Sequence, residues 1–439
     1  MLPRRLLAMI VALILISASG AHAQIDNLTN MSSQWIRMSN RNAATDAPDI
    51  MVYNPAGLTG LAQGYHMDIA NQFMVRRPEH SYIDPITGRR FTDAQDSPDL
   101  FVPNLYAAYT EGRAAVFAGI YIPGGGISVD YPDGSYTTRS LGARLIGPDG
   151  PFYGSYTVIA RESLKADSTY LALSAGAAYR LTDVVSVALA IRTIQADNSI
   201  DGKLTLAGGL GGASTPDLPL RIDVDETSRG WGGILGIQAT PLDDLVLAMR
   251  YETRVKLDFE ADVNTDDIGL YSDGEKNRRD FPAMLGLGVS YRFTPELRCE
   301  ADLNWFFQKQ ADWGENPQGG DIASDAGDVW SIGASAAYQA YPDLEVSCGF
   351  LYTRHDWGDM DAYYNASLGA FEVLYSDNVN LAAGLCHLVR PGVKINCGLS
   401  CTIWKDEDIV TPIGTVDTSN RTVTGALGIN IAFPARKTR

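Results

Sequence analysis

The chain has 439 residues, of which 45% are hydrophobic and 20% are charged, and its formal net charge at pH 7 is −17. A chain this acidic is not drawn to nucleic acid or to anionic lipid by its net charge, so we expect no nucleic-acid partner. The five cysteines are odd in number and lack the paired spacing of a zinc site. We therefore expect no metal site and no cofactor, and we interpret the cysteines as small apolar side chains within strands.

The first 23 residues have the pattern of a secretory signal peptide. Arg4 and Arg5 form a basic start, residues 6–16 are apolar, and small residues stand at Ala21 and Ala23, as a signal peptidase requires. The apolar run is too short to span a bilayer, for which a helix needs about 20 residues. We expect cleavage after Ala23 and export of the mature chain.

Residues 24–62 precede the first convincing strand, which we place at residues 65–75. This stretch is too long for a simple tail, and it carries apolar side chains such as Trp35 and Ile36 that are unfavourable in water. Near its end stands Asn-Pro-Ala-Gly at residues 54–57, four residue types that favour a compact turn. These four residues alone are equally compatible with an ordinary turn before a strand.

From residue 63 to residue 433, apolar and small or polar side chains alternate again and again. In residues 297–308 the odd positions are Leu, Cys, Ala, Leu, Trp and Phe, and the even ones are mainly charged or amide residues. This period of two predicts strands with one apolar face. Short turns link the strands in pairs. Longer polar stretches separate the pairs, at residues 76–102, 124–168, 198–222, 260–280, 311–327, 355–375 and 405–420.

Tight turns at one end and long loops at the other predict a transmembrane antiparallel β-barrel. We count about fourteen strands over residues 63–433, which puts both chain ends at the tight-turn end, followed by a tail at residues 434–439. Residues 24–62 would then fill the barrel lumen as a plug. A secreted β-sandwich also alternates, but its core would reject charges in mid-strand. Such charges stand on the face we assign to the lumen, at Arg192, Arg250, Glu252, Glu300 and Asp302.

Residues 42–61, NAATDAPDIMVYNPAGLTGL, resemble the hatch segment of the FadL family of outer-membrane transporters for long-chain fatty acids and related hydrophobic compounds. The matching positions are Asp46, Asn54, Pro55, Ala56 and Gly57. Residues 106–126 also resemble the second hairpin of the family, whose strand runs into a Pro-Gly stretch. The chain departs from the family in having no glycines just before Asp46 and in ending on PARKTR after Phe433.

The resemblance implies passive uptake of a hydrophobic compound through a bacterial outer membrane. Family members open their wall sideways at a kink in the third strand, and the matching residues here are Pro123, Gly124, Gly125 and Gly126. Pro removes a ladder hydrogen bond and glycine bends freely, so pairing should break there. The alternative is the end of a strand entering a loop, and we favour the kink. We expect a monomer in contact with outer-membrane lipid and lipopolysaccharide.

The candidate ligand site lies in an unusually apolar predicted loop, residues 204–220, with residues 267–274 as its counterpart across the next strand pair. Its apolar candidates are Leu204, Leu206, Leu210 and Leu218. Arg192 or Arg250 would meet the carboxylate of a fatty acid, unless these arginines pair with acids such as Glu252. The sequence does not select among fatty acids, alkanes and aromatic hydrocarbons.

We predict no enzymatic activity. The mature chain has no G-x-S-x-G sequence, and it shows no Ser-His pair placed for nucleophilic catalysis. The alternative function is a general porin for polar solutes, or a structural surface barrel. A porin needs no plug, so the role of residues 24–62 separates the two hypotheses.

Overall fold

The computed structural model describes residues 30–434, apart from residues 96, 210–214, 317 and 368. The predicted signal peptide and residues 435–439 of the predicted tail therefore lie outside the described residues, as does Leu210. Among the described residues, no helix is long and apolar enough to cross a membrane.

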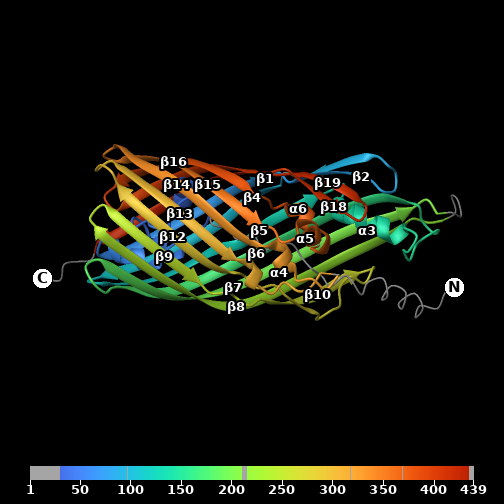
Figure 1. The fold of residues 1–439 in the computed structure, drawn as a ribbon, viewed down its shortest axis with the longest axis horizontal. Helices are drawn as coiled ribbons and strands as arrows, with labels where there is room; N and C mark the ends of the chain where they lie inside the picture. The colour runs from blue at the N-terminus through green and yellow to red at the C-terminus, as the bar shows by residue number, and fades with distance from the viewer. Residues whose placement is uncertain (1–29, 96, 210–214, 317, 368, 435–439) are drawn as a thin grey trace.

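Within the described residues, fourteen antiparallel strands pair into a closed ring, which confirms the predicted all-β barrel (Figure 1). The first and last strands, β1 and β20, pair with each other, and β8 pairs with β9. The ring strands are β1 (Gly64–Arg76), β4 (Pro98–Glu111), β5 (Ala114–Tyr131), β6 (Val158–Arg180), β7 (Val185–Ala207), β8 (Leu218–Leu242), β9 (Leu245–Glu252), β12 (Ala283–Arg292), β13 (Leu297–Phe307), β14 (Asp328–Tyr341), β15 (Leu344–Asp356), β16 (Asn378–Arg390), β17 (Val393–Trp404) and β20 (Arg421–Pro434). Two further strands, β10 (Asp258–Asp266) and β11 (Lys276–Arg278), extend the wall beside β8.

Short turns connect the ring strands in pairs at one end, on the left of Figure 1, which we call the tight-turn end. β1 begins there and β20 ends there, as expected for an even number of strands. The opposite end, called the loop end, carries the longer connections.

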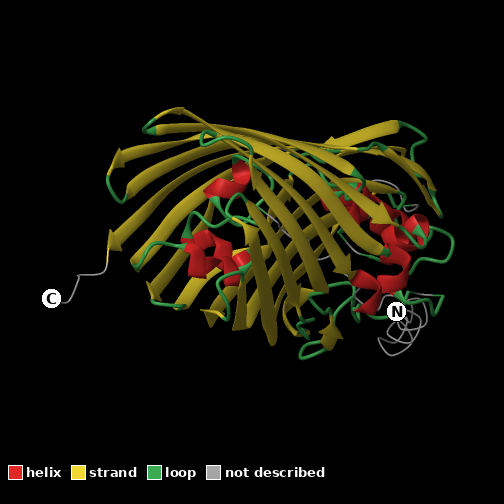
Figure 2. Ribbon diagram, turned by 60° about the vertical axis from the view of Figure 1, so that its left-hand side comes forward, coloured by secondary structure: helices red, strands yellow, loops and turns green. Residues whose placement is uncertain are grey.

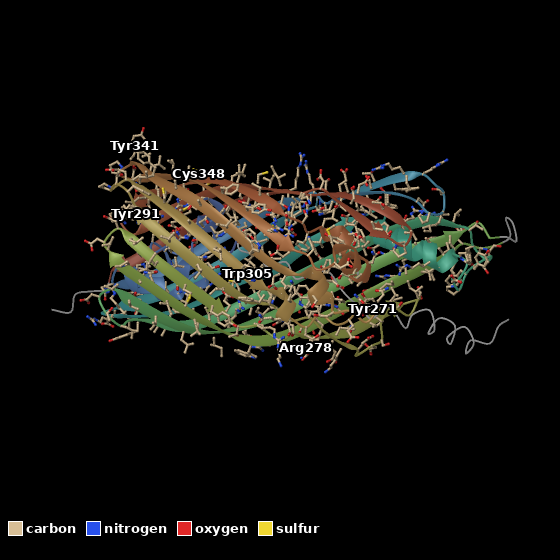
Figure 3. All side chains as sticks on the ribbon, in the orientation of Figure 1. Tyr271, Arg278, Tyr291, Trp305, Tyr341 and Cys348 are labelled. Carbon is tan, nitrogen blue, oxygen red and sulfur yellow. The ribbon has the colours of Figure 1, made fainter. Side chains whose placement is uncertain are left out.

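Side chains alternate between the two faces of each ring strand, with polar groups inside and apolar groups outside. In β1, Asp68 and Gln72 are buried, whereas Met67, Ile69 and Phe73 are exposed. The charges predicted to face the lumen are buried in the same way. Aromatic residues such as Tyr291 and Tyr341 mark the tight-turn end (Figure 3). An exposed apolar belt with aromatic residues at this margin suits lipid and not water.

Three ring strands are far longer than a membrane requires. β6 and β7 have 23 residues each and β8 has 25. At about 3.3 Å per residue, a strand of 23 residues is about 76 Å long, against about 30 Å of hydrocarbon. The predicted loops at 124–168 and 198–222 are therefore wrong in extent, because residues 158–168, 198–207 and 218–222 are paired strand.

The loop end is closed by a second sheet and a group of helices (Figures 1 and 2). Tyr82, Tyr136, Trp313, Tyr363 and Phe371 belong to the apolar cluster that joins these elements. The sheet consists of β18 (Glu407–Thr411), β19 (Gly414–Ser419), β2 (Glu79–Ile83) and β3 (Arg90–Ala94). The helices are α3 (Tyr136–Ile146), the 3-10 helix η4 (Gln308–Gln310), α4 (Ile322–Ala326), α5 (Met360–Ala366) and α6 (Ala370–Val373).

Residues 30–63, called the N-terminal segment, lie within the ring near the tight-turn end. The segment forms α2 (Ser33–Ile36) and the 3-10 helices η1 (Pro48–Val52) and η2 (Pro55–Gly60). Most of its residues are buried, and it packs against strands all around the ring. Figure 2 shows short helices inside the strand ring, apart from the group at the loop end.

Candidate functional site

The long strands reverse the face on which they carry apolar side chains. In the half of β7 near the tight-turn end, Leu189 faces outward and is exposed, whereas Arg192 faces inward and is 2% exposed. Toward the loop end of the same strand, Lys203 is exposed and Leu204 and Leu206 are buried. Successive side chains point to opposite faces, so this exchange moves the apolar surface from the outside of the barrel to its inside. β6 and β8 change in the same way.

The inner surface near the loop end lines a cavity of about 140 Å³, which we call the apolar cavity. Its walls come from β5, β6, β7, β8, α3, α6 and the loop that follows β10. Figure 3 places Tyr271, one of its lining residues, in the half of the molecule toward the loop end. The lining side chains are mostly apolar and include Val129, Leu141, Leu164, Ile200, Leu204, Leu220, Ile222, Ile268, Leu270 and Val373.

The charged groups at the cavity are occupied by partners. Arg279 lies 3.5 Å from Glu226, and the Lys203 ammonium lies 3.0 Å from Asp201. The Thr137 hydroxyl donates to the Glu372 carboxylate at 3.0 Å. Burial raises the pKa of the Tyr271 hydroxyl, because the apolar surroundings disfavour its charged form. Tyr271 therefore stays neutral, and the cavity presents little free charge to a ligand.

The structure brings some of the predicted leucines to this cavity. Leu204 lines it, and Leu206 and Leu218 belong to the apolar packing around it. The predicted counterpart at residues 267–274 also reaches it, through Ile268, Leu270 and Tyr271.

Sequence reasoning missed the contributions of α3 and α6. Leu141 on α3 and Val373 on α6 both line the cavity. The signal for α3 was present, because Ser135 begins a capping box with Thr138 ahead of an eleven-residue helix. The four-residue α6 is too short to leave a periodic pattern.

Arg192 and Arg250 lie in the lumen away from the lining of the apolar cavity. Both pair with Glu252: Arg192 donates to its carboxylate, and the Arg250 Nε lies 3.4 Å from it. All three side chains are buried. The sequence left open whether these arginines pair with Glu252, and in the structure they do.

Strand pairing breaks at the residues matching the third-strand kink. The ladder between β4 and β5 ends at the pair Leu105–Ile120, and the register between β5 and β6 shifts on both sides of Gly125. Gly125 has φ +64, and a Cβ there would lie 2.5 Å from the Tyr170 ring and 2.9 Å from the Ser168 carbonyl oxygen. Only glycine fits this position without displacement. Gly125 also lines the apolar cavity, so the irregular wall and the cavity are in contact.

The N-terminal segment is fixed to the wall by charges and amides. Arg41 is buried and donates two hydrogen bonds to Asp49, at 3.1 and 2.7 Å, and it also pairs with Asp46 at 2.7 Å. Asp46 in turn lies 3.2 Å from Arg298 on β13. Asp302 on β13 accepts the backbone N–H of Arg41 at 2.6 Å. The last two contacts tie the segment to β13, and the ion pairs of Arg41 hold the segment together internally.

The Asn-Pro-Ala-Gly residues begin a 3-10 helix. Asn54 caps η2 by accepting the N–H of Ala56 at 3.3 Å, and its amide donates to the Ile237 carbonyl at 3.0 Å. Pro55 opens the helix. Gly57 does not have a left-handed backbone. It is needed for space, because a Cβ there would lie 2.8 Å from the Ala44 carbonyl oxygen.

A polar cavity of about 820 Å³ lies between the N-terminal segment and the tight-turn end, lined by Arg37, Asp46 and Arg298 among others. Among the described residues, no group of three or more His, Cys, Asp or Glu side chains could hold a metal ion. The five cysteines are free thiols on ring strands.

No family model matches the sequence, and no curated protein matches it significantly. Solved structures do match. A Pseudomonas aeruginosa FadL homologue superposes with a TM-score of 0.63 at 13% identity, over 94% of this chain and 100% of that chain. The chain has the FadL fold.

Two toluene transporters share the FadL fold with this chain. The P. putida transporter TodX gives a TM-score of 0.61 at 14% identity, over 91% of this chain and 98% of that chain. The Ralstonia pickettii transporter TbuX gives 0.56 at 17% identity, over 88% and 94%. The resemblance to the FadL family noted at residues 42–61 is thereby confirmed at the level of the fold. These neighbours are transporters and not enzymes.

Proposed function

We propose that the chain is a bacterial outer-membrane channel for passive uptake of small hydrophobic compounds. The apolar belt on the outside of the ring supports a location in lipid, where the extended loop end would stand among lipopolysaccharide. The FadL fold, shared with transporters of toluene, supports the same reading. We take the functional unit to be a monomer, because the ring closes within one chain.

The observation that carries the proposal is the apolar cavity at the loop end, in contact with the break in the wall at Gly125. A hydrophobic solute gains nothing from a water-filled pore, because water disfavours apolar surface. An apolar cavity removes that surface from water. A ligand held there lies beside the part of the wall where strand pairing is interrupted, which would provide a sideways exit through residues 123–126.

The size and charge of the cavity favour a compact neutral ligand. Its volume of about 140 Å³ is close to the ~150 Å³ of an engineered apolar cavity that binds benzene. Arg192 and Arg250 are already paired with Glu252, so a fatty-acid carboxylate would have no free lumenal partner there. We therefore place small hydrocarbons, such as the toluene named for the similar transporters, ahead of long-chain fatty acids.

Residues 30–62 would act as the hatch that closes the axial route. Their burial inside the ring and their charged contacts to β13 support this role. A closed axis directs the solute to the wall and keeps ions from leaking through the bore. Movement of the segment on ligand binding would then be a step in transport.

The proposal is tested by adding a charge to one face or the other of β7. In Leu204→Asp a carboxylate enters the apolar cavity, and in Thr205→Asp the same carboxylate stands on the opposite, outward face. An unpaired charge in an apolar site is strongly unfavourable, so we expect uptake of radiolabelled toluene by cells to fall at least ~10-fold in Leu204→Asp alone.

Both variants are first shown to be folded by heat-modifiable migration on gels. Equal toluene uptake by Leu204→Asp and the wild type would remove the cavity from the pathway. A steady ion conductance with no uptake of toluene would favour a general porin.

A further inference from the structure

A further cavity meets the apolar cavity at α6. This lumenal cavity has a volume of about 130 Å³ and reaches from Trp35 of the N-terminal segment to Tyr375 near the loop end. Among the described residues, Val373 is the side chain that lines both cavities. Val373 therefore stands in the partition between them.

The two cavities differ in chemistry. The apolar cavity is surrounded mainly by Leu, Ile and Val side chains. The lumenal cavity is mixed: apolar and aromatic side chains such as Trp35, Phe306, Val329 and Leu351 line it together with hydroxyl and amide groups such as Ser331, Asn380, Ser400, Thr402 and Thr424. A hydrocarbon that extended into the lumenal cavity would lie against hydroxyl and amide groups whose hydrogen bonds it cannot make, which is less favourable than the more apolar surroundings of the apolar cavity.

Hydrogen bonds from three directions hold the partition in place. The Thr137 hydroxyl of α3 donates to the Glu372 carboxylate at 3.0 Å, and the Tyr131 hydroxyl of β5 donates to the Glu372 carbonyl at 3.3 Å. The Asn420 amide donates to the carbonyls of Val373 and Leu374, each at 3.1 Å. Leu374 has a left-handed φ of 52, which a non-glycine residue adopts only when its surroundings enforce it.

We propose that Val373 is a specificity-determining residue that sets the length of the hydrophobic compound the protein accepts. The inference rests on the proposed function and deepens it. The Val373 side chain closes the apolar cavity on the side of the lumen, so a ligand is accommodated only up to the point where it meets Val373. A longer chain has to push past α6 into surroundings that include hydroxyl and amide groups.

The proposal predicts that, along a series of alkylbenzenes, affinity rises with alkyl-chain length only up to one point, which we call the break. Each methylene group buried in an apolar site raises affinity by about fourfold. In the wild type the gain per methylene continues until the alkyl chain reaches Val373 and then stops. Removing two methyl groups in Val373→Ala moves the break to a longer chain, and the larger ring in Val373→Phe moves it to a shorter one.

The experiment measures binding of toluene, butylbenzene, hexylbenzene and octylbenzene to the full-length protein in lipid nanodiscs, with empty nanodiscs as the background. The matched control is Val263→Ala, which removes the same two methyl groups from a side chain that packs in the neighbouring apolar cluster but is not among the lining residues of either cavity. Heat-modifiable migration shows that each variant is folded.

We expect opposite shifts of the break in Val373→Ala and Val373→Phe and no shift in Val263→Ala. The same break in all four proteins, or an equal shift in Val263→Ala, would overturn the role of Val373 while leaving the apolar cavity as the binding site. If the wild type binds no member of the series above background, the proposed function fails, and the role of Val373 fails with it.

Discussion

The barrel has a long-strand half, from β5 to β8, and a short-strand half, from β13 to β17. Side chains alternate between the inner and outer faces in both halves, but the alternation serves a different purpose in each. The short strands keep mainly polar side chains inside and apolar ones outside, with Phe306, Val329 and Leu351 as apolar exceptions on the inner face. The long strands begin with that pattern and then invert it beyond the belt. The inversion builds an apolar interior at the loop end, whereas the short half keeps a polar wall that binds the N-terminal segment.

For the proposed channel, each half has a separate task. The short-strand half contributes Asp302 and Arg298, which hold the N-terminal segment across the bore. The long-strand half contributes the apolar cavity and the irregular wall at Gly125. A change in one half should therefore alter closure of the bore, and a change in the other should alter passage of the ligand.

The largest expected effect comes from the N-terminal segment, which the short-strand half holds in place. Arg41→Met removes the guanidinium that pairs with Asp49, and it leaves Asp46 with Arg298 alone. Removing one member of a buried ion pair costs about 3–5 kcal/mol. We expect the segment to loosen, so that ion conductance in planar bilayers rises and the midpoint of urea unfolding falls.

The control for that change is Arg113→Met. Arg113 pairs with Asp183 in an exposed tight turn, at 2.9 Å. Exposed ion pairs contribute about 0–1 kcal/mol. A conductance as low in Arg41→Met as in Arg113→Met would show that the charged contacts do not hold the bore closed.

The inversion along β7 is tested by placing arginine at two points on one face. Leu189 and Gln195 both point outward, within the apolar belt and beyond it. An arginine at mid-membrane costs about 2–4 kcal/mol in a barrel and about 0–1 near the interface. We expect Leu189→Arg to lower the free energy of unfolding in lipid by the larger amount and Gln195→Arg by the smaller. Equal losses would contradict the assignment of the belt.

A smaller effect on stability, with a separate effect on transport, is expected at Gly125. Gly125→Ala and Gly112→Ala both put a Cβ on a left-handed residue, with φ +64 and +59. Each should cost about 1–2 kcal/mol. At Gly125 the Cβ also meets Tyr170 and Ser168, whereas nothing lies within 4 Å at Gly112.

We therefore expect toluene uptake to fall by about tenfold in Gly125→Ala, the change that ~1.4 kcal/mol of added barrier produces. Uptake by Gly112→Ala should match the wild type when both are compared at equal surface abundance. Similar uptake by the two variants would exclude the wall at Gly125 from the route.

The ring was predictable because its pattern is repeated in every strand. Residues 65–75 and 297–308 alternate cleanly, and lipid on one side and polar surroundings on the other require that alternation. The extent of β6 to β8 was not predictable in the same way. Beyond the belt the outward face meets water, so the apolar residues move to the other face and the segment resembles a polar loop.

The candidate site was only partly predictable. The leucines near residue 204 stood out because they are apolar within a segment taken for a loop. The position of Val373 at the cavity depends on hydrogen bonds from α3, β5 and Asn420, which come from distant parts of the chain. The partnering of Arg192 with Glu252 follows from the pairing of β7, β8 and β9, which a single strand does not reveal.

Ion conductance and toluene flux, recorded on the same purified wild-type protein reconstituted into bilayers, test most directly whether the apolar cavity carries the solute past a closed bore. We expect toluene to cross faster than in protein-free bilayers while the ion current stays at the background level. A steady ion current through the wild-type protein, with toluene flux no greater than in protein-free bilayers, would contradict the proposal that the cavity carries the solute past a closed bore.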